Sequence, residues 1–162
     1  HRSLAQLLEV SEAVRFDVLA RHLQGAGEPD RAAVCASVAA DRAFSGLRFA
    51  EAAEFYGWAL EWDASDSADR QRWIVRRASA LSAAGRAAEA APLFLSAASS
   101  ASRDRAFELR RLAAEQLLVS GRVDEGRAIL RPLFREIGLR YPDSTAATIR
   151  PGCPRPLYPP SL

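Results

Sequence analysis

The sequence contains no lysine, no asparagine and no methionine, and all 22 of its basic side chains are arginines. The missing lysine excludes several kinds of chemistry. A Walker-type phosphate loop and the ATP site of a protein kinase both need a lysine ammonium on the nucleotide, and Schiff-base catalysis needs a lysine amine. None of these sites can be completed here. Arginine and alanine in place of lysine and asparagine indicate GC-rich coding of bacterial type.

Cysteine and histidine are also scarce, with two of each. Cys35, Cys153, His1 and His22 show no ligand spacing such as C-x2-C or H-x3-H, so we predict no metal site and no cofactor. The spacing does not indicate a disulfide, and Cys35 is expected to be a small core residue. No serine lies in a G-x-S-x-G elbow. We therefore expect no catalytic residues and no enzyme activity in this chain.

Long hydrophobic runs are missing too. No apolar run approaches the roughly 18 residues of a membrane span, and no signal-peptide pattern is present. Twenty acidic side chains offset the basic ones to a net charge of +2. Most arginines share a helix with an acid, as in Asp69-Arg70, which indicates a mixed surface rather than a nucleic-acid-binding stripe. We expect a cytoplasmic protein without a membrane partner, and a nucleic-acid partner is disfavoured.

Alanine dominates what is present, and apolar residues recur at helical spacing without strand-like alternation. Glycine often separates the periodic stretches. The pattern predicts an all-α protein with helices over residues 3–9, 12–24, 30–45, 49–62, 68–84, 87–99, 104–120 and 123–137. Pro92 and Pro132 lie inside predicted helices, and we expect a bend at Pro132 rather than two separate helices.

Three segments share one spacing. Ala52 and Ala90 lie 38 residues apart, and Ala90 and Gly126 lie 36 apart. Each is a small residue about five positions after a predicted turn, and a large residue (Tyr56, Phe94 or Leu130) follows four positions later. Small residues let two helices approach closely, and the large residue fills the space between units. One helical hairpin cannot bury its apolar face alone, so such units stack.

This pattern resembles the tetratricopeptide repeat and predicts a solenoid of antiparallel helix pairs over residues 1–142; a generic bundle of helical hairpins is the alternative. Six of the nine prolines lie in the last 21 residues. Because proline lacks an amide donor and the segment lacks apolar periodicity, we predict an extended or disordered tail over residues 143–162.

Three stretches carry a narrower resemblance: 25–33 (GAGEPDRAA), 47–60 (LRFAEAAEFYGWAL) and 110–139 (RRLAAEQLLVSGRVDEGRAILRPLFREIGL). They resemble the helical region of large bacterial regulators, in which a Ser/Thr protein kinase domain and an AAA-type ATPase precede such an array. The resemblance covers about residues 3–142 and is most specific in the last third. It implies a regulatory or protein-binding arm of a signalling protein. No kinase or ATPase motif is present, so none carries over.

In this repeat type, the first helix of each pair lines a concave groove that contacts a peptide. Aligning the three repeats of this chain with the repeat family gives the positions expected to line the groove. They are Val34, Ser37, Asp41 and Phe44 in the first repeat, Arg72, Val75, Ser79 and Ser82 in the second, and Glu108, Arg111, Glu115 and Leu118 in the third. The principal candidates are Asp41, Phe44, Arg72, Ser79, Arg111 and Glu115. The repeat groove that grips a C-terminal carboxylate uses lysine and asparagine, which are absent. Arg72 and Arg111 are instead expected to pair with acidic side chains. Alternatively, these positions pack on neighbouring domains of the parent chain.

The sequence thus favours an arm that binds protein or peptide segments, possibly domains of its own parent chain. The second hypothesis is a nucleic-acid-associated transcriptional regulator. It requires six arginines to line one face: Arg70, Arg72, Arg76, Arg77, Arg110 and Arg111. The aromatic residues Phe49, Phe55, Tyr56, Trp58, Trp62 and Trp73 are expected to pack in the core, with an exposed ligand platform as the alternative.

Overall fold

The computed structural model describes residues 15–63 and 69–141, and every regular element in these ranges is an α-helix. The helices are α2 (Phe16–Gly25), α3 (Pro29–Ser45), α4 (Phe49–Trp62), α5 (Arg70–Ala83), α6 (Ala87–Ala98), α7 (Arg103–Val119) and α8 (Val123–Glu136). The all-α prediction is confirmed for this part of the chain. The predicted helix over 3–9, the start of the one over 12–24, and the proline-rich tail over 143–162 lie outside the described residues.

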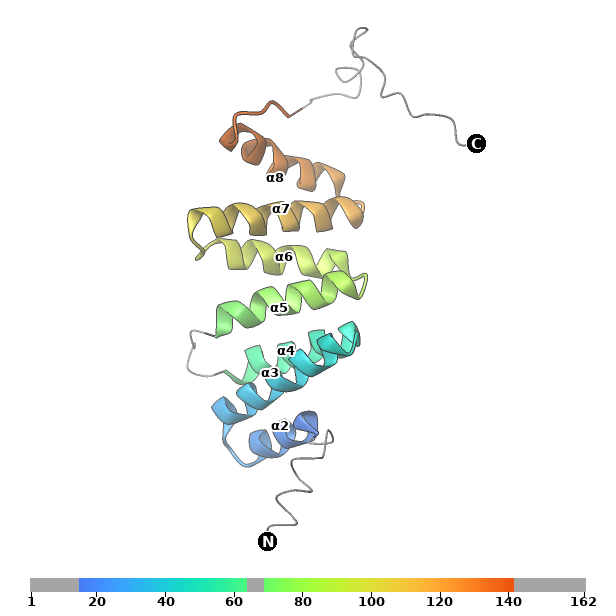
Figure 1. The fold of residues 1–162 in the computed structure, drawn as a ribbon, viewed down its shortest axis with the longest axis vertical. Helices are drawn as coiled ribbons and strands as arrows, with labels where there is room; N and C mark the ends of the chain where they lie inside the picture. The colour runs from blue at the N-terminus through green and yellow to red at the C-terminus, as the bar shows by residue number, and fades with distance from the viewer. Residues whose placement is uncertain (1–14, 64–68, 142–162) are drawn as a thin grey trace, which may run out of the picture.

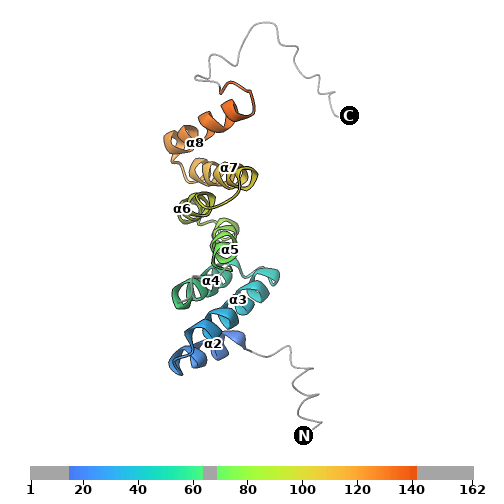
Figure 2. The ribbon, with the colours of Figure 1, turned by 90° about the vertical axis from the view of Figure 1, so that its left-hand side faces the viewer.

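The helices follow one another along the long axis, with α3 and α4 overlapping in this view; the connections after α3, α5 and α7 lie on one side of the stack and those after α2 and α6 on the other (Figure 1). The view turned by 90° shows the same order (Figure 2). Each helix makes its main contacts with the helices that precede and follow it in the sequence. None of the described helices is long and apolar enough to cross a membrane.

The turns after α3, α5 and α7 are built in the same way. Each contains one residue with positive φ: Leu47 at 59°, Gly85 at 77° and Gly121 at 83°. The next amide in each turn, that of Arg48, Arg86 or Arg122, donates a 2.8 Å hydrogen bond back into the preceding helix. This bond and the left-handed residue together form a Schellman closure, which satisfies a carbonyl at the helix end. The three predicted turns are confirmed.

An ion pair recurs directly after each of these turns. Arginine and glutamate three residues apart lie 2.7 Å apart in Arg48–Glu51, 2.7 Å in Arg86–Glu89 and 2.6 Å in Arg122–Glu125. A glutamate in the first helical turn also faces the partial positive charge of the helix N-terminus. These pairs are exposed and therefore add little stability. The three connections therefore share both the turn conformation and the ion pair that follows it.

Small residues are buried at the matching positions of α4, α6 and α8. Ala52 and Ala90 are fully buried. At Gly126, a Cβ atom would lie only 2.9 Å from Leu118 Cγ, so α7 and α8 approach too closely for a side chain. Tyr56 and Phe94 are 1% and 2% exposed, which confirms both as buried fillers. Leu130 on α8 is only half-buried, because no described helix follows α8 to cover it.

The two prolines inside predicted helices do not divide them. α6 continues through Pro92 and α8 through Pro132, and both prolines are exposed. The prediction of one helix at each proline is confirmed. The bend expected at Pro132 stays a prediction.

Candidate partner-binding cleft

A cleft of about 350 Å³ lies between α5 and α7, with the end of α6 at its base. It is lined by Gln71, Arg72, Val75, Arg76, Ala97, Ser100, Ala101, Arg105 and Leu109. The four α5 residues share one face of that helix, because they fall at helical spacing. Arg105 and Leu109 come from the first turns of α7, and Ser100 and Ala101 from the connection before it. The cleft therefore joins two helices that are not consecutive in the chain.

The base of the cleft is apolar. Leu109 and Ala97 are each 1% exposed, and Val75 and Ala101 are half-buried. On the rim, the side-chain amide of Gln71 donates a hydrogen bond to the Ser100 hydroxyl, which links α5 to the connection between α6 and α7. An apolar base with a polar rim suits a ligand that inserts one aliphatic or aromatic side chain.

Three arginines and no carboxylate line this cleft. Arg72 lies 3.3 Å from Asp69, and both side chains are more than half exposed. Neither Arg76 nor Arg105 forms an ion pair with an acid of the described residues. Three other clefts in the described ranges each include at least one acidic side chain. The cleft between α5 and α7 is therefore unusually cationic for this molecule.

A part-buried hydrogen bond links α3 to α4. Tyr56 on α4 donates a hydrogen bond from its hydroxyl to the Asp41 carboxylate on α3. Burial, and then the bond to this carboxylate, raise the pKa of Tyr56 above its ordinary value, whereas the charges of Arg76 and Arg72 act in the opposite direction.

The structure brings only part of the predicted groove to this cleft. From the predicted positions, Arg72 and Val75 line it. Ser79 is half-buried and donates a 3.0 Å hydrogen bond to the Val75 carbonyl on its own helix. Ser82, next to the end of α5, is also half-buried.

The α3 candidates lie away from the cleft lining. Phe44 is half-buried and packs edge-on against Phe49 at a centroid distance of 5.1 Å. Val34 is 53% exposed, but Ser37 is only 5% exposed and donates its hydroxyl to the Val34 carbonyl. Ser37 therefore offers a partner almost no surface.

The α7 candidates have local partners. Arg111 lies 3.1 Å from Glu108 and 3.4 Å from Glu115, all on the same helix. It does not line the cleft with Arg72, so the two do not form the expected pair of groove arginines. Leu118 packs against Gly126 of α8. The cleft instead uses Arg105, one of the residues that the register missed.

Arg76 was also missed as a groove position, although its place four residues after Arg72 on α5 was a usable signal. Arg105 had no such signal, because its approach to α5 depends on how α6 spaces the two helices. Two of the predicted α5 positions, Arg72 and Val75, line the cleft, but the repeat spacing did not indicate which residues of α7 lie opposite them.

The six arginines of the nucleic-acid hypothesis do not share one face. Arg72 and Arg76 line the cleft, whereas Arg77 lies in another cleft with Glu54 and Glu61. Arg70 donates a 2.9 Å hydrogen bond to the Leu60 carbonyl. Together with the glutamate partners of Arg111, this dispersal leaves no uninterrupted basic stripe of these residues.

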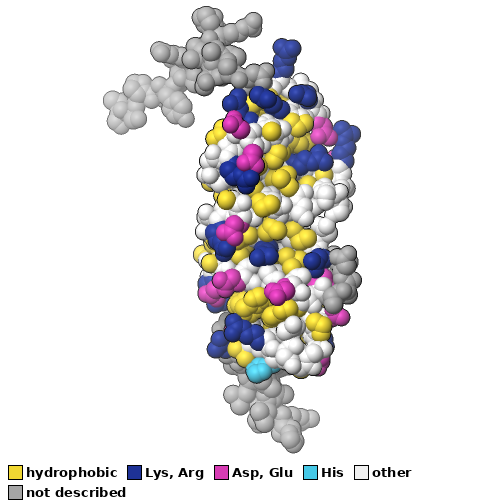
Figure 3. Space-filling model, turned by 180° about the vertical axis from the view of Figure 1, so that it is seen from behind, with side chains coloured by type: hydrophobic (Ala, Val, Ile, Leu, Met, Phe, Trp, Pro, Cys, Tyr) yellow, Lys and Arg dark blue, Asp and Glu magenta, His cyan; other side chains and the backbone are white. Residues whose placement is uncertain are grey.

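The aromatic residues divide into two groups. Tyr56 and Trp73 are buried, as predicted. Phe55, Trp58 and Trp62 are half-buried and follow one another along α4, with ring centroids 4.9 Å and 5.5 Å apart. The Arg21 guanidinium lies 4.6 Å from the centroid of Trp58. Figure 3 shows hydrophobic side chains gathered along the middle of the face seen from behind, among arginines and acids.

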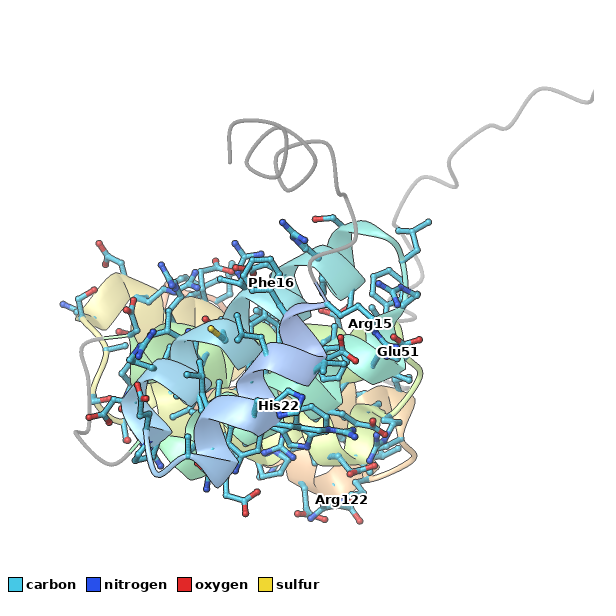
Figure 4. All side chains as sticks on the ribbon, turned by 90° about the horizontal axis from the view of Figure 1, so that it is seen from below. Arg15, Phe16, His22, Glu51 and Arg122 are labelled. Carbon is cyan, nitrogen blue, oxygen red and sulfur yellow. The ribbon has the colours of Figure 1, made fainter. Side chains whose placement is uncertain are left out.

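The described residues contain no group of three or more His, Cys, Asp and Glu side chains that could hold a metal ion. His22 is exposed on α2, as the view from below shows (Figure 4). Cys35 is a free, half-buried thiol on α3. No protein-family model, no curated protein and no solved structure matches this chain.

Proposed function

We propose that this chain is a helical-repeat arm that binds an extended segment of another protein, or of its own parent chain, in the cleft between α5 and α7. The repeat is of tetratricopeptide type, with antiparallel pairs α3–α4, α5–α6 and α7–α8. Three turns of the same construction support this assignment, as do the small residues at the helix crossings. In such a stack, the first helices of successive pairs border the binding groove.

The cleft is the observation that carries the proposal. Its apolar base can bury one or two side chains, and its polar rim can bind the backbone and charges of an extended segment. The only hydroxyl in its lining is that of Ser100, which accepts a hydrogen bond from Gln71 and has no histidine or carboxylate beside it in the lining. This composition is suited to recognition rather than to bond cleavage.

The resemblance to large bacterial kinase and ATPase regulators suggests the context in which the arm acts. There the arm would hold a partner, or another domain of the same chain, beside the catalytic parts of a cytoplasmic signalling protein. This chain itself would remain non-catalytic.

The test is a selection of binding peptides from a random displayed library. Ala101→Phe fills the base of the cleft, because Ala101 lies in its lining. Ala88→Phe makes the same change at an exposed position of α6 outside the lining and is the control. We expect peptides selected on the wild-type chain to lose binding to Ala101→Phe and to keep it on Ala88→Phe. Peptides that bind all three proteins equally would contradict a role for the cleft.

A further inference from the structure

We infer that the segment bound in the cleft is acidic: it places an apolar side chain on the base formed by Val75 and Leu109 and carboxylates on Arg76 and Arg105. This inference rests on the proposed function and specifies the chemistry of the partner. It differs from the sequence-based expectation, in which Arg72 and Arg111 were the arginines that pair with acids.

The first argument is the absence of neutralising acids. Elsewhere in the described chain, arginines commonly pair with a glutamate three residues away, as Arg48, Arg86, Arg111 and Arg122 do. In the cleft, neither Arg76 nor Arg105 forms such a pair, since Glu108, three residues after Arg105, pairs with Arg111 instead, and no carboxylate lies in the lining. Like charges that converge on one cleft repel each other, and an anionic ligand removes that repulsion.

The second argument is that Asp41, an acid of α3, has a neutral partner. Asp41 accepts a hydrogen bond from Tyr56 and forms no ion pair with Arg76. Arg76 remains available to a ligand, and its planar guanidinium can donate two parallel hydrogen bonds to a carboxylate.

The third argument is the arrangement of the two walls. Arg76 belongs to α5 and Arg105 to α7, and the apolar residues lie between these helices at the base. A ligand side chain on the base therefore has a guanidinium on each side of it. Acidic residues that flank an aliphatic or aromatic residue match this order of charge, apolar surface and charge.

The experiment compares three proteins in the same peptide selection. Arg76→Gln combined with Arg105→Gln removes the two cleft charges. Arg110→Gln combined with Arg140→Gln removes two exposed charges that lie outside the cleft lining and form no ion pair with described residues. Peptides selected on the wild-type chain should be enriched in Asp and Glu beside an apolar residue. Their affinity should fall about tenfold on the cleft variant, as expected for losing a charged hydrogen bond, and stay unchanged on the control. It should also weaken as sodium chloride is raised.

The outcomes separate the two proposals. Peptides that depend on the cleft, as shown by Ala101→Phe, but carry no acidic enrichment would overturn the acidic partner and leave the proposed function intact. Peptides insensitive to Ala101→Phe would contradict the proposed function itself. Stronger binding of a single-stranded oligonucleotide, lost in the cleft variant, would assign the arginines to phosphate and overturn the inference. If the double cleft variant loses its helical circular dichroism, the exposed single variant Arg105→Gln takes its place.

Discussion

Replacing Gly126 with alanine tests why glycine occupies this position. The close packing of α8 against α7 favours glycine, whereas helix propensity favours alanine. Gly126 is buried in α8 at the position that alanine occupies in α4 and α6. An added Cβ would lie 2.9 Å from Leu118 Cγ and 3.1 Å from the Ala114 carbonyl oxygen. The leucine could shift partly, but the carbonyl belongs to the backbone of α7. Relief therefore requires α8 to move away from α7.

The magnitude is a difference between two effects. Overpacking a close contact costs about 1–3 kcal/mol. Alanine in place of glycine inside a helix contributes about 1 kcal/mol of stability. We therefore expect Gly126→Ala to lower the free energy of unfolding by up to about 2 kcal/mol.

Gly57→Ala is the matched control, because Gly57 is also inside a helix. The three atoms nearest to its added Cβ all belong to the guanidinium of Arg77, the closest at 3.3 Å, and an arginine side chain is flexible. The propensity gain should remain, so Gly57→Ala should stabilise the protein by up to about 1 kcal/mol. Urea denaturation followed by circular dichroism measures both variants, with an unchanged m-value as the check on comparability. If Gly126→Ala stabilised the protein as much as Gly57→Ala does, the close approach of α7 and α8 would be refuted.

Two further predictions concern backbone strain and pH. Leu47 holds the left-handed turn position that glycine fills at Gly85 and Gly121, and its side chain is 73% exposed. Leu47→Gly should therefore raise the free energy of unfolding by about 1 kcal/mol, and an unchanged or lower urea midpoint would contradict this. The pKa of Tyr56 is raised, mainly by burial, so the folded state keeps this proton while unfolded tyrosine ionises near pH ~10. The free energy of unfolding should fall as pH rises above about 10, and it should fall less steeply in Tyr56→Phe. The same pH dependence in both proteins would contradict this prediction. The chain contains no lysine, so the titration that usually competes in this pH range is absent.

The sequence was sufficient for the helices because their ends are determined locally. α4 begins and ends at the residues predicted from periodicity, and the ends of α3 and α5–α8 differ from prediction by at most two residues. The positive-φ turns and the recurring small residues are local signals of the same kind. The burial of Tyr56 and Phe94 could also be predicted from local spacing, because each large residue lies at a fixed distance from the preceding turn.

The cleft was harder to predict because it depends on residues far apart in the chain. Register placed Arg72 and Val75 correctly on one wall but could not show that Arg105 lies on the other. Arg111 has local partners that the spacing itself predicts, since Glu108 and Glu115 lie three and four residues away. Spacing alone does not decide such pairs, because Glu108 also lies three residues after Arg105 and pairs with Arg111 instead.

The position of α6 has a consequence for how such a cleft can be altered. α6 packs against both α5 and α7, and it buries mainly alanines there, together with Phe94. The spacing between the walls therefore depends on the side-chain volume that α6 buries, which is small because most of its buried residues are alanines. Larger residues in place of these alanines would push the two walls apart without changing the arginines, which belong to α5 and α7. Width and charge can thus vary independently in this molecule, because they are encoded on different helices.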